Sequence, residues 1–256
     1  MSNTAKAFQN GKAFIPFVTA GDPSIQVTKE LILGMAKAGA DLIEIGIPFS
    51  DPVAEGPVIQ AADERALEGG VTSDAIFEMV KEIRRECDIP LAFMTYFNPV
   101  YVYGVKRFLK RCKACGIDAL IVPDLPFEEK QELFPGCLEN GVDLISLIAP
   151  TSEERIKTIA KEAQGFLYCV SSMGVTGVRS KITTDIGAMV SHVRAVSKIP
   201  CAIGFGISTP QQAKEMAQNA DGVIVGSAIV KLCGQYGADC IEPVLSYVRE
   251  MKQAIL

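Results

Sequence analysis

The chain has 256 residues, a formal net charge of −5 at pH 7 and an apolar fraction of 48%. The negative charge argues against a nucleic-acid partner, which needs clustered positive charge. No apolar run approaches the roughly twenty residues of a membrane span, and the polar segment 1–12 lacks the apolar stretch of a signal peptide. We therefore expect a cytoplasmic protein. The length allows two small domains or one α/β barrel, and we favour a single domain over 1–256.

Eight cysteines and one histidine offer little material for a metal site. Most of the cysteines lie in apolar surroundings, and in a reducing compartment such residues act as small hydrophobic side chains. Cys112 and Cys115 have the spacing of a zinc or redox motif, but they fall late in a helical pattern without a second pair of ligands. We interpret these two as core residues, we expect His192 on a helix surface, and we predict no metal site.

Segments with the properties of strands alternate with helical segments along the chain. Runs rich in β-branched and aromatic residues predict eight strands, at 14–19, 40–47, 90–96, 119–122, 144–148, 166–171, 201–204 and 223–225. Helical patterns follow, at 22–38, 58–67, 73–87, 105–115, 127–138, 152–163, 185–197, 209–218 and over most of the chain after 225. Two helices follow the second strand, and Pro135-Gly136 can interrupt the helix at 127–138.

Eight strand-helix units in about 250 residues predict a closed (β/α)8 barrel. The fold class is therefore α/β, a single-domain TIM barrel with extra helices. A doubly wound open sheet is the alternative, but such sheets usually have fewer strands and leave two edges to protect. In a barrel, the loops that follow the strands form the active-site face.

A single carboxylate interrupts the apolar run of the second strand. By the two-residue alternation of a strand, its isoleucines share one face, while Glu44 lies on the other face with Leu42 and Gly46. If the isoleucines pack under helices, Glu44 points into the barrel, where burial raises its pKa toward neutrality and suits it to proton transfer. A structural ion pair with a buried Arg or Lys is the alternative. The loop after this strand adds two more carboxylates, Asp51 and Glu55.

Three consecutive loops near the end of the chain contain glycines, in the segments 174–177, 204–208 and 226–227. Glycine lets backbone N–H groups approach an anion closely, and a helix start such as Ser227 adds a favourable dipole. Tight turns also need glycine, so each loop alone is a weak signal. Together, in the last three units of a barrel, they match the usual place of a phosphate site, with Arg179 and Lys181 nearby. We predict that the substrate is a phosphate ester.

The barrel mouth is expected to bind the other end of this substrate. Phe17, Tyr96 and Tyr168 face inward by alternation and by position on their strands. Aromatic residues on strands usually belong to the core. Together with Glu44, these three rings describe a pocket for a flat apolar group.

Several segments resemble the α subunit of tryptophan synthase: PFVTAGDP at 16–23, EIGIPFSDP at 44–52 with GPVIQ at 56–60, GVTG at 174–177, GFGIS at 204–208 and GSAIV at 226–230. They extend over nearly the whole chain in the order that the family has. The resemblance implies retro-aldol cleavage of indole-3-glycerol phosphate to indole and glyceraldehyde 3-phosphate, a carbon-carbon lyase reaction of tryptophan biosynthesis.

By this resemblance Glu44 protonates the indole ring at the carbon that bears the side chain, and it helps to deprotonate the glycerol hydroxyl. Glu55 matches a second carboxylate, which binds the indole N–H and stabilises the positive charge that develops on the ring. The family has Asp at this position. The extra methylene of Glu55 moves the carboxylate by roughly an ångström, a shift that can lower the rate if the loop does not compensate.

The resemblance also assigns residues that bind the substrate. Tyr168 matches a pocket tyrosine and Thr176 matches a loop residue that helps to close the site. The phosphate contacts match Gly177, Phe205, Gly206, Gly226 and Ser227. Ser172-Met173 stands before Gly174 where the family has Arg and a small residue.

The family implies a partner, a pyridoxal-phosphate-dependent β subunit that receives indole through a channel within an α2β2 heterotetramer. The chain itself is then expected to need no cofactor. The implied contact surface comprises the loops at Asp51 and Pro52, at Asn98 and Pro99, and at Leu125 and Pro126. Two alternatives remain: another phosphate-binding barrel, such as an isomerase of phosphoribosyl intermediates, and a non-catalytic subunit that activates a partner.

Overall fold

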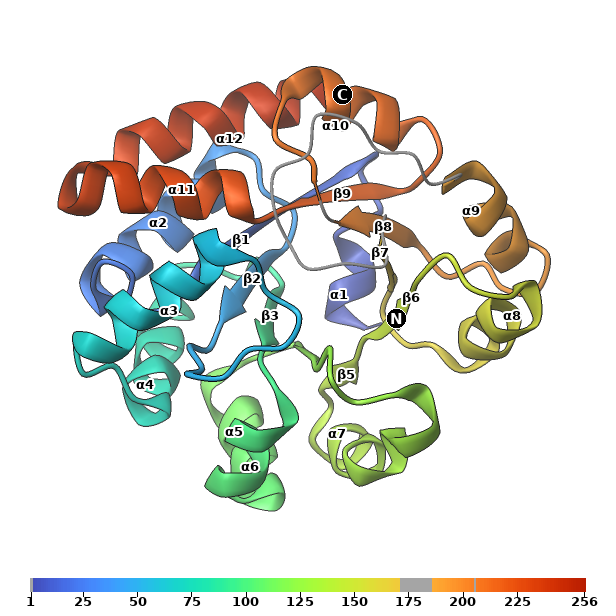
Figure 1. The fold of residues 1–256 in the computed structure, drawn as a ribbon, viewed down its shortest axis with the longest axis horizontal. Helices are drawn as coiled ribbons and strands as arrows, with labels where there is room; N and C mark the ends of the chain where they lie inside the picture. Colours follow the sequence, from blue (N-terminus) through green and yellow to red (C-terminus); the bar gives the residue numbers. More distant parts are fainter. Residues whose placement is uncertain (1, 171–185, 205) are drawn as a thin grey trace.

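The computed structural model describes residues 2–170, 186–204 and 206–256, and parallel strands form a nearly closed barrel inside a ring of helices (Figure 1). The strands are β1 Ala13–Thr19, β2 Ile43–Gly46, β3 Leu91–Met94, β4 Ala119–Ile121, β5 Asp143–Leu144, β6 Ser146–Ile148, β7 Leu167–Val170, β8 Cys201–Gly204 and β9 Gly222–Val225. The predicted α/β TIM barrel is confirmed. Because it has one barrel core with helices around it, the described chain forms a single domain.

The helices of the described residues form the outer layer of the barrel, except the first, which covers one of its ends (Figure 1). They are α1 Asn3–Lys6, α2 Ile25–Ala38, α3 Pro57–Glu68, α4 Ser73–Ile83, α5 Phe97–Tyr103, α6 Val105–Cys115, η1 Phe127–Glu132, α7 Phe134–Asn140, α8 Glu153–Glu162, α9 Ile186–Arg194, α10 Pro210–Ala217, α11 Ser227–Tyr236, η2 Gly237–Asp239 and α12 Ile241–Ile255. None of these helices is long and apolar enough to cross a membrane.

The barrel closes through one interrupted strand. The sheet order is β5-β4-β3-β2-β1-β9-β8-β7-β6, so β5 pairs with β4 whereas β6 pairs with β7. Ile145 separates these two short strands, and its N–H still donates to the Leu120 carbonyl at 3.0 Å. The pair β5 and β6 therefore corresponds to the single fifth strand that was expected at 144–148, and the eight predicted units are confirmed.

The side-chain alternation of β2 follows the prediction. Ile43 and Ile45 belong to the core between the strands and the helices, whereas Leu42 lies in the cluster that fills the barrel interior. Glu44 shares this inner side, where β2 pairs with β1 and β3 at Phe17 and Ala92. The strand is shorter than expected, Ile43–Gly46 instead of 40–47.

Three helical segments depart from the expected pattern. The short helix α1 lies within the polar start of the chain and covers one end of the barrel, where the rings of Phe8 and Phe166 lie 5.5 Å apart (Figure 1). Helix α5 precedes α6, where one helix was expected. The helix expected at 127–138 is divided into η1 and α7, because Pro135 fits only the first turn of a helix.

The predicted core cysteines are buried. Cys112 and Cys115 lie on the inner side of α6, and all eight cysteines, which fall within the described residues, are free. His192 lies on α9 with its side chain 33% exposed, and its Nδ1 is 3.6 Å from a carboxylate oxygen of Glu153. The described part of the chain contains no cluster of three or more potential metal ligands.

A half-buried arginine connects the amino ends of β3 and β4 with the layer of helices. Arg84, which follows α4, donates to the Asp118 carboxylate at 2.6 Å and to the Gly116 carbonyl at 2.8 Å. Asp118 also accepts the N–H of Leu91, the first residue of β3, at 2.8 Å. This network lies at the end of the barrel opposite the carboxyl ends of the strands, the end that in barrels serves stability.

We predict that Arg84→Leu lowers the free energy of unfolding by about 3 kcal/mol, because it leaves the carboxylate of Asp118 without its cationic partner. Chemical denaturation measures this loss. Arg85→Leu is the matched control, since Arg85 is exposed, and its effect should stay within about 0.5 kcal/mol. Equal effects of the two substitutions would contradict the structural role of Arg84.

Candidate active site

A narrow cavity of about 40 Å³ lies over the carboxyl ends of the strands. Its lining combines acids, aromatic rings, aliphatic side chains and glycines from both halves of the chain: Phe17, Glu44, Glu55, Ile59, Met94, Tyr168, Gly206, Ile207, Ile224, Gly226 and Ser227. Seven of the predicted site residues are thus brought together. Thr176, Gly177 and Phe205, which were also predicted, lie outside the described residues.

Glu44 is completely buried at the centre of this group. Neither of its carboxylate oxygens has a hydrogen-bond partner, and none of the described Lys or Arg side chains forms an ion pair with it. Burial therefore raises the pKa of Glu44 well above its ordinary value of 4.5. Within the described chain, the alternative of a structural ion pair finds no partner, and a raised pKa is the property that proton transfer near neutrality requires.

Two aromatic rings line the cavity beside Glu44, and each depends on a glycine in a neighbouring strand. A Cβ atom at Gly46 would lie 2.5 Å from the Phe17 ring, and one at Gly204 would overlap the ring of Tyr168. Burial raises the pKa of Tyr168, so its hydroxyl stays neutral. With the aliphatic side chains of the lining, the two rings make the cavity wall next to the acid mainly apolar.

Glu55 reaches the cavity from the loop between β2 and α3. Gln60 on α3 donates its side-chain amide to the Glu55 carbonyl at 2.7 Å, and the neighbouring Ala54 N–H donates to the hydroxyl of Tyr96 at 3.0 Å. Burial raises the pKa of Glu55, while hydrogen bonds with Asp63 and Tyr96 oppose this rise. Tyr96 is buried behind the loop and is not among the residues that line the cavity.

The glycine side of the cavity suits an anion. Gly206 has φ +81°, a left-handed conformation that favours glycine, and Gly226 immediately precedes the first turn of α11. Ser227, the first residue of this helix, is buried against the cavity. The free N–H groups and the dipole of a helix start favour a bound phosphate.

Several lining residues and one nearby acid are absent from the predicted set. Met94 and Ile224 are found by the same alternation that placed Glu44, since Met94 is two residues from Ala92 on the inner side of β3. Ile59 and Ile207 belong to a helix and a loop, where no such period applies. Asp63 lies on the buried side of α3 with Ile59. A charged residue within the apolar stripe of a helix was the sequence signal that could have revealed it.

The residues predicted to contact a partner lie at the same end of the barrel, since they follow β2, β3 and β4. Asp51, Asn98 and Pro126 are exposed, and Pro52 is half-buried. Three apolar side chains near them are unusually exposed: Val53 at 72%, Tyr101 at 68% and Val102 at 76%. Exposed apolar groups in one region are typical of interaction surfaces.

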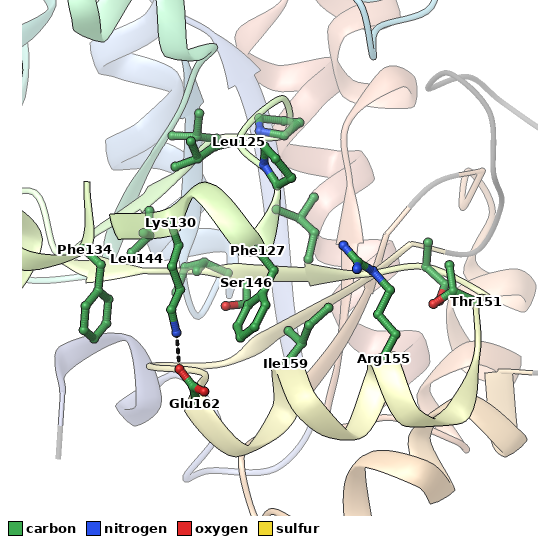
Figure 2. A pocket seen from close by; sticks show the side chains of 16 residues that line it. Leu125, Phe127, Lys130, Phe134, Leu144, Ser146, Thr151, Arg155, Ile159 and Glu162 are labelled. Carbon is green, nitrogen blue, oxygen red and sulfur yellow. Dashed lines mark hydrogen bonds and ion pairs between the residues drawn. The ribbon is translucent and has the colours of Figure 1, made fainter. Parts of the chain in front are cut away.

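A larger cavity, of about 210 Å³, lies between η1, α7 and α8 (Figure 2). Its walls combine apolar side chains with polar and charged ones, and Figure 2 shows the ion pair of Lys130 with Glu162 at one edge. Arg155, which also lines it, pairs with the exposed Glu128. This cavity contains neither an unpaired buried acid nor a glycine loop in the described residues, so the smaller cavity is the candidate active site.

The fold and the site define a class of protein. It comprises the TIM-barrel enzymes that have an acid at the carboxyl ends of the strands and a site suited to an anion beside it. The family model of the tryptophan synthase alpha chain matches residues 3–256. Tryptophan synthase alpha chains of Lactiplantibacillus plantarum and Lacticaseibacillus casei are 49% and 46% identical, over 100% of this chain and 97% and 96% of theirs. The chain belongs to the tryptophan synthase alpha chain family.

Solved structures agree with this assignment. A tryptophan synthase alpha chain from Legionella pneumophila superposes with a TM-score of 0.89 at 36% identity, covering 100% of this chain and 97% of that one. A chain of the tryptophan synthase complex from Pyrococcus furiosus gives a TM-score of 0.86 at 36% identity and covers 94% of this chain and 98% of that one.

We predict that the stability advantage of Glu44→Gln over the parent chain grows with pH. A raised pKa in the folded state means that folding favours the protonated acid, so the parent loses stability as pH rises from about 4.5 toward the pKa of folded Glu44. The variant lacks this loss, and the difference should grow by up to about 1.4 kcal/mol per pH unit.

Denaturation at a series of pH values measures this difference. Glu64→Gln on the exposed side of α3 is the matched control, and its difference from the parent should stay nearly constant. A constant difference for Glu44→Gln between pH 5 and pH 8 would mean that Glu44 is not held protonated by the fold.

Proposed function

We propose that this chain cleaves indole-3-glycerol phosphate to indole and glyceraldehyde 3-phosphate. The observation that carries the proposal is Glu44, a fully buried acid without a hydrogen-bond partner in the described chain. It lies at the centre of a cavity that is also lined by Gly206 and Gly226. The phosphate binds at Gly206, Gly226 and Ser227, and the indole ring lies in the apolar space beside Phe17 and Tyr168. The family relation favours this reaction over the isomerisation of a phosphoribosyl intermediate.

In the proposed reaction, Glu44 gives its proton to the ring carbon that bears the side chain. The hydroxyl on the adjacent carbon then gives its proton to the Glu44 carboxylate, its oxygen forms the aldehyde carbonyl, and the carbon-carbon bond breaks. The electron pair of that bond returns to the protonated ring and restores neutral indole. Burial suits Glu44 to the first step, because an acid with a raised pKa carries its proton at neutral pH.

Glu55 stabilises the positive charge on the ring during this sequence by accepting a hydrogen bond from the indole N–H. Its carboxylate lines the same cavity as Glu44, while its backbone is fixed by Gln60. A negative charge in a cavity closed to water stabilises a developing positive charge more strongly than in solvent.

The proposed partner is a pyridoxal-phosphate-dependent β subunit in an α2β2 assembly, which receives the indole. The exposed loops at Asp51 and Pro52, at Asn98 and at Pro126 form the contact surface, together with the exposed apolar residue Val53. In this proposal the pyridoxal phosphate belongs to the partner, and this chain works through its own carboxyl and backbone groups. The free cysteines fit the reducing cytoplasm as its location.

We predict that Glu44→Gln lowers indole release from indole-3-glycerol phosphate by at least about 100-fold, because glutamine has the same shape but cannot deliver a proton. Affinity for inorganic phosphate should stay unchanged. Glu64→Gln serves as the control and should keep full activity. Unchanged turnover in Glu44→Gln would remove the proposed role, and a parent chain that binds the substrate but releases no indole, with or without a β subunit, would indicate a non-catalytic subunit.

For Glu55→Asp we predict no gain in rate. The backbone at this position is fixed, so the shorter side chain withdraws the carboxylate by roughly an ångström, a displacement that costs up to about 100-fold in a preorganised site. Steady-state kinetics of indole release measures the effect. A large rise in kcat would show that the loop is not adapted to glutamate.

A further inference from the structure

Asp63 is a buried acid that no step of the proposed reaction uses. It is 4% exposed and belongs to the inner side of α3. Toward β1 and α11 this helix presents Ile59 and Ala62, which form an apolar cluster with Phe17 and Val230. These neighbours offer no charge to compensate the carboxyl group of Asp63.

The carboxyl group of Asp63 meets the loop that carries Glu55. The N–H of Phe49 donates to Asp63 Oδ2 at 3.4 Å. Burial, the charge of Glu55 and a hydrogen bond with Glu55 raise the pKa of Asp63 to about 9. A hydrogen bond between two carboxyl groups requires a proton on one of them, because ionised carboxylates only accept.

No cation in the described chain forms an ion pair with these two acids. Arg65, two residues further along α3, donates to both oxygens of Asp22 at 2.8 Å each. Asp22 adds to the negative charge near Asp63, and burial raises the pKa of Tyr96 so that its hydroxyl remains neutral. Two carboxyl groups that are hydrogen-bonded to each other in such surroundings cannot both be ionised at neutral pH.

The surroundings decide which acid holds the proton. Glu55 lines the cavity and is half-buried, whereas Asp63 is enclosed. The negative charge is therefore more stable on Glu55. Because Oδ2 of Asp63 accepts from Phe49, Oδ1 is left to hold the proton.

We infer that Asp63 is a positioning residue for Glu55: it holds the proton of the pair and donates it to the Glu55 carboxylate, which stays charged and fixed at the cavity. This inference rests on the proposed role of Glu55 at the indole N–H. It adds a requirement to that role, because the charge of Glu55 then depends on a neutral acid behind it.

Carboxyl titration by NMR tests the proton directly and without any activity. In protein labelled with carbon-13 at the aspartate carboxyl, the resonance that disappears in Asp63→Asn belongs to Asp63. We expect it to report a protonated carboxyl group at pH 7 and to titrate near pH 9. In Glu55→Gln the same resonance should titrate at lower pH, because the charge that opposes ionisation of Asp63 is gone. An ionised Asp63 at pH 7 in the parent chain would overturn the inference.

Two substitutions of similar size test the donated hydrogen bond. Asp63→Asn keeps a neutral donor and should retain most of kcat, whereas Asp63→Leu removes it and should lower kcat by about 100-fold, with affinity for inorganic phosphate unchanged. A role in packing alone predicts the opposite order or equal effects, since leucine suits an apolar stripe, and either result would overturn the inference.

Failure of the inference can be distinguished from failure of the proposed function. If Glu44→Gln retains turnover, the proposed reaction is wrong, but the titration still decides whether Asp63 holds a proton. If Glu44→Gln loses turnover while Asp63 is ionised at pH 7, the reaction stands and the role of Asp63 is wrong.

Discussion

Glu44 is held inside the barrel without a hydrogen-bond partner in the described chain, and the other parts of the site are arranged around this carboxyl group. An isolated buried charge is costly, so the group favours its neutral form, and a neutral carboxylic acid can donate a proton. The strand that carries Glu44 is fixed on both sides by pairing with β1 and β3. Glycines at positions 46 and 204 then leave room for the aromatic rings that keep water from the acid.

The molecule accommodates buried and half-buried carboxyl groups in three different ways. Asp118, half-buried at the amino ends of the strands, is paired with Arg84 and with the N–H of Leu91, an arrangement that joins elements and supplies stability. Glu44 lacks such donors, and burial raises its pKa and so favours its protonated form. Glu55 and Asp63 lie between these cases, because one proton between them allows one negative charge to remain in the site. Stability and reactivity are thus placed at opposite ends of the barrel, as is common in this fold.

Much of this arrangement could be predicted from the sequence because it follows from patterns that repeat over a few residues or over one strand-helix unit. The two-residue alternation of a strand put Glu44 inside the barrel, and the succession of strands and helices was sufficient for the fold. The closure at Ile145 could not be predicted, since it depends on two partner strands that are distant in sequence. Tyr96 faced inward by the same alternation, but its hydroxyl pairs with the loop at Ala54. The partnership of Asp63 with Glu55 likewise arises only when a helix returns to its own preceding loop.

The most direct test is a carboxyl titration of Glu44 itself. In protein labelled with carbon-13 at the glutamate side-chain carboxyl, the resonance lost in Glu44→Gln identifies this residue. If the buried acid supplies the proton of the reaction, the resonance reports a protonated group at pH 7 and titrates well above the ordinary glutamate value of 4.5. A Glu44 that is ionised at pH 7, with a titration near the ordinary value, would contradict its role as the acid that protonates the substrate.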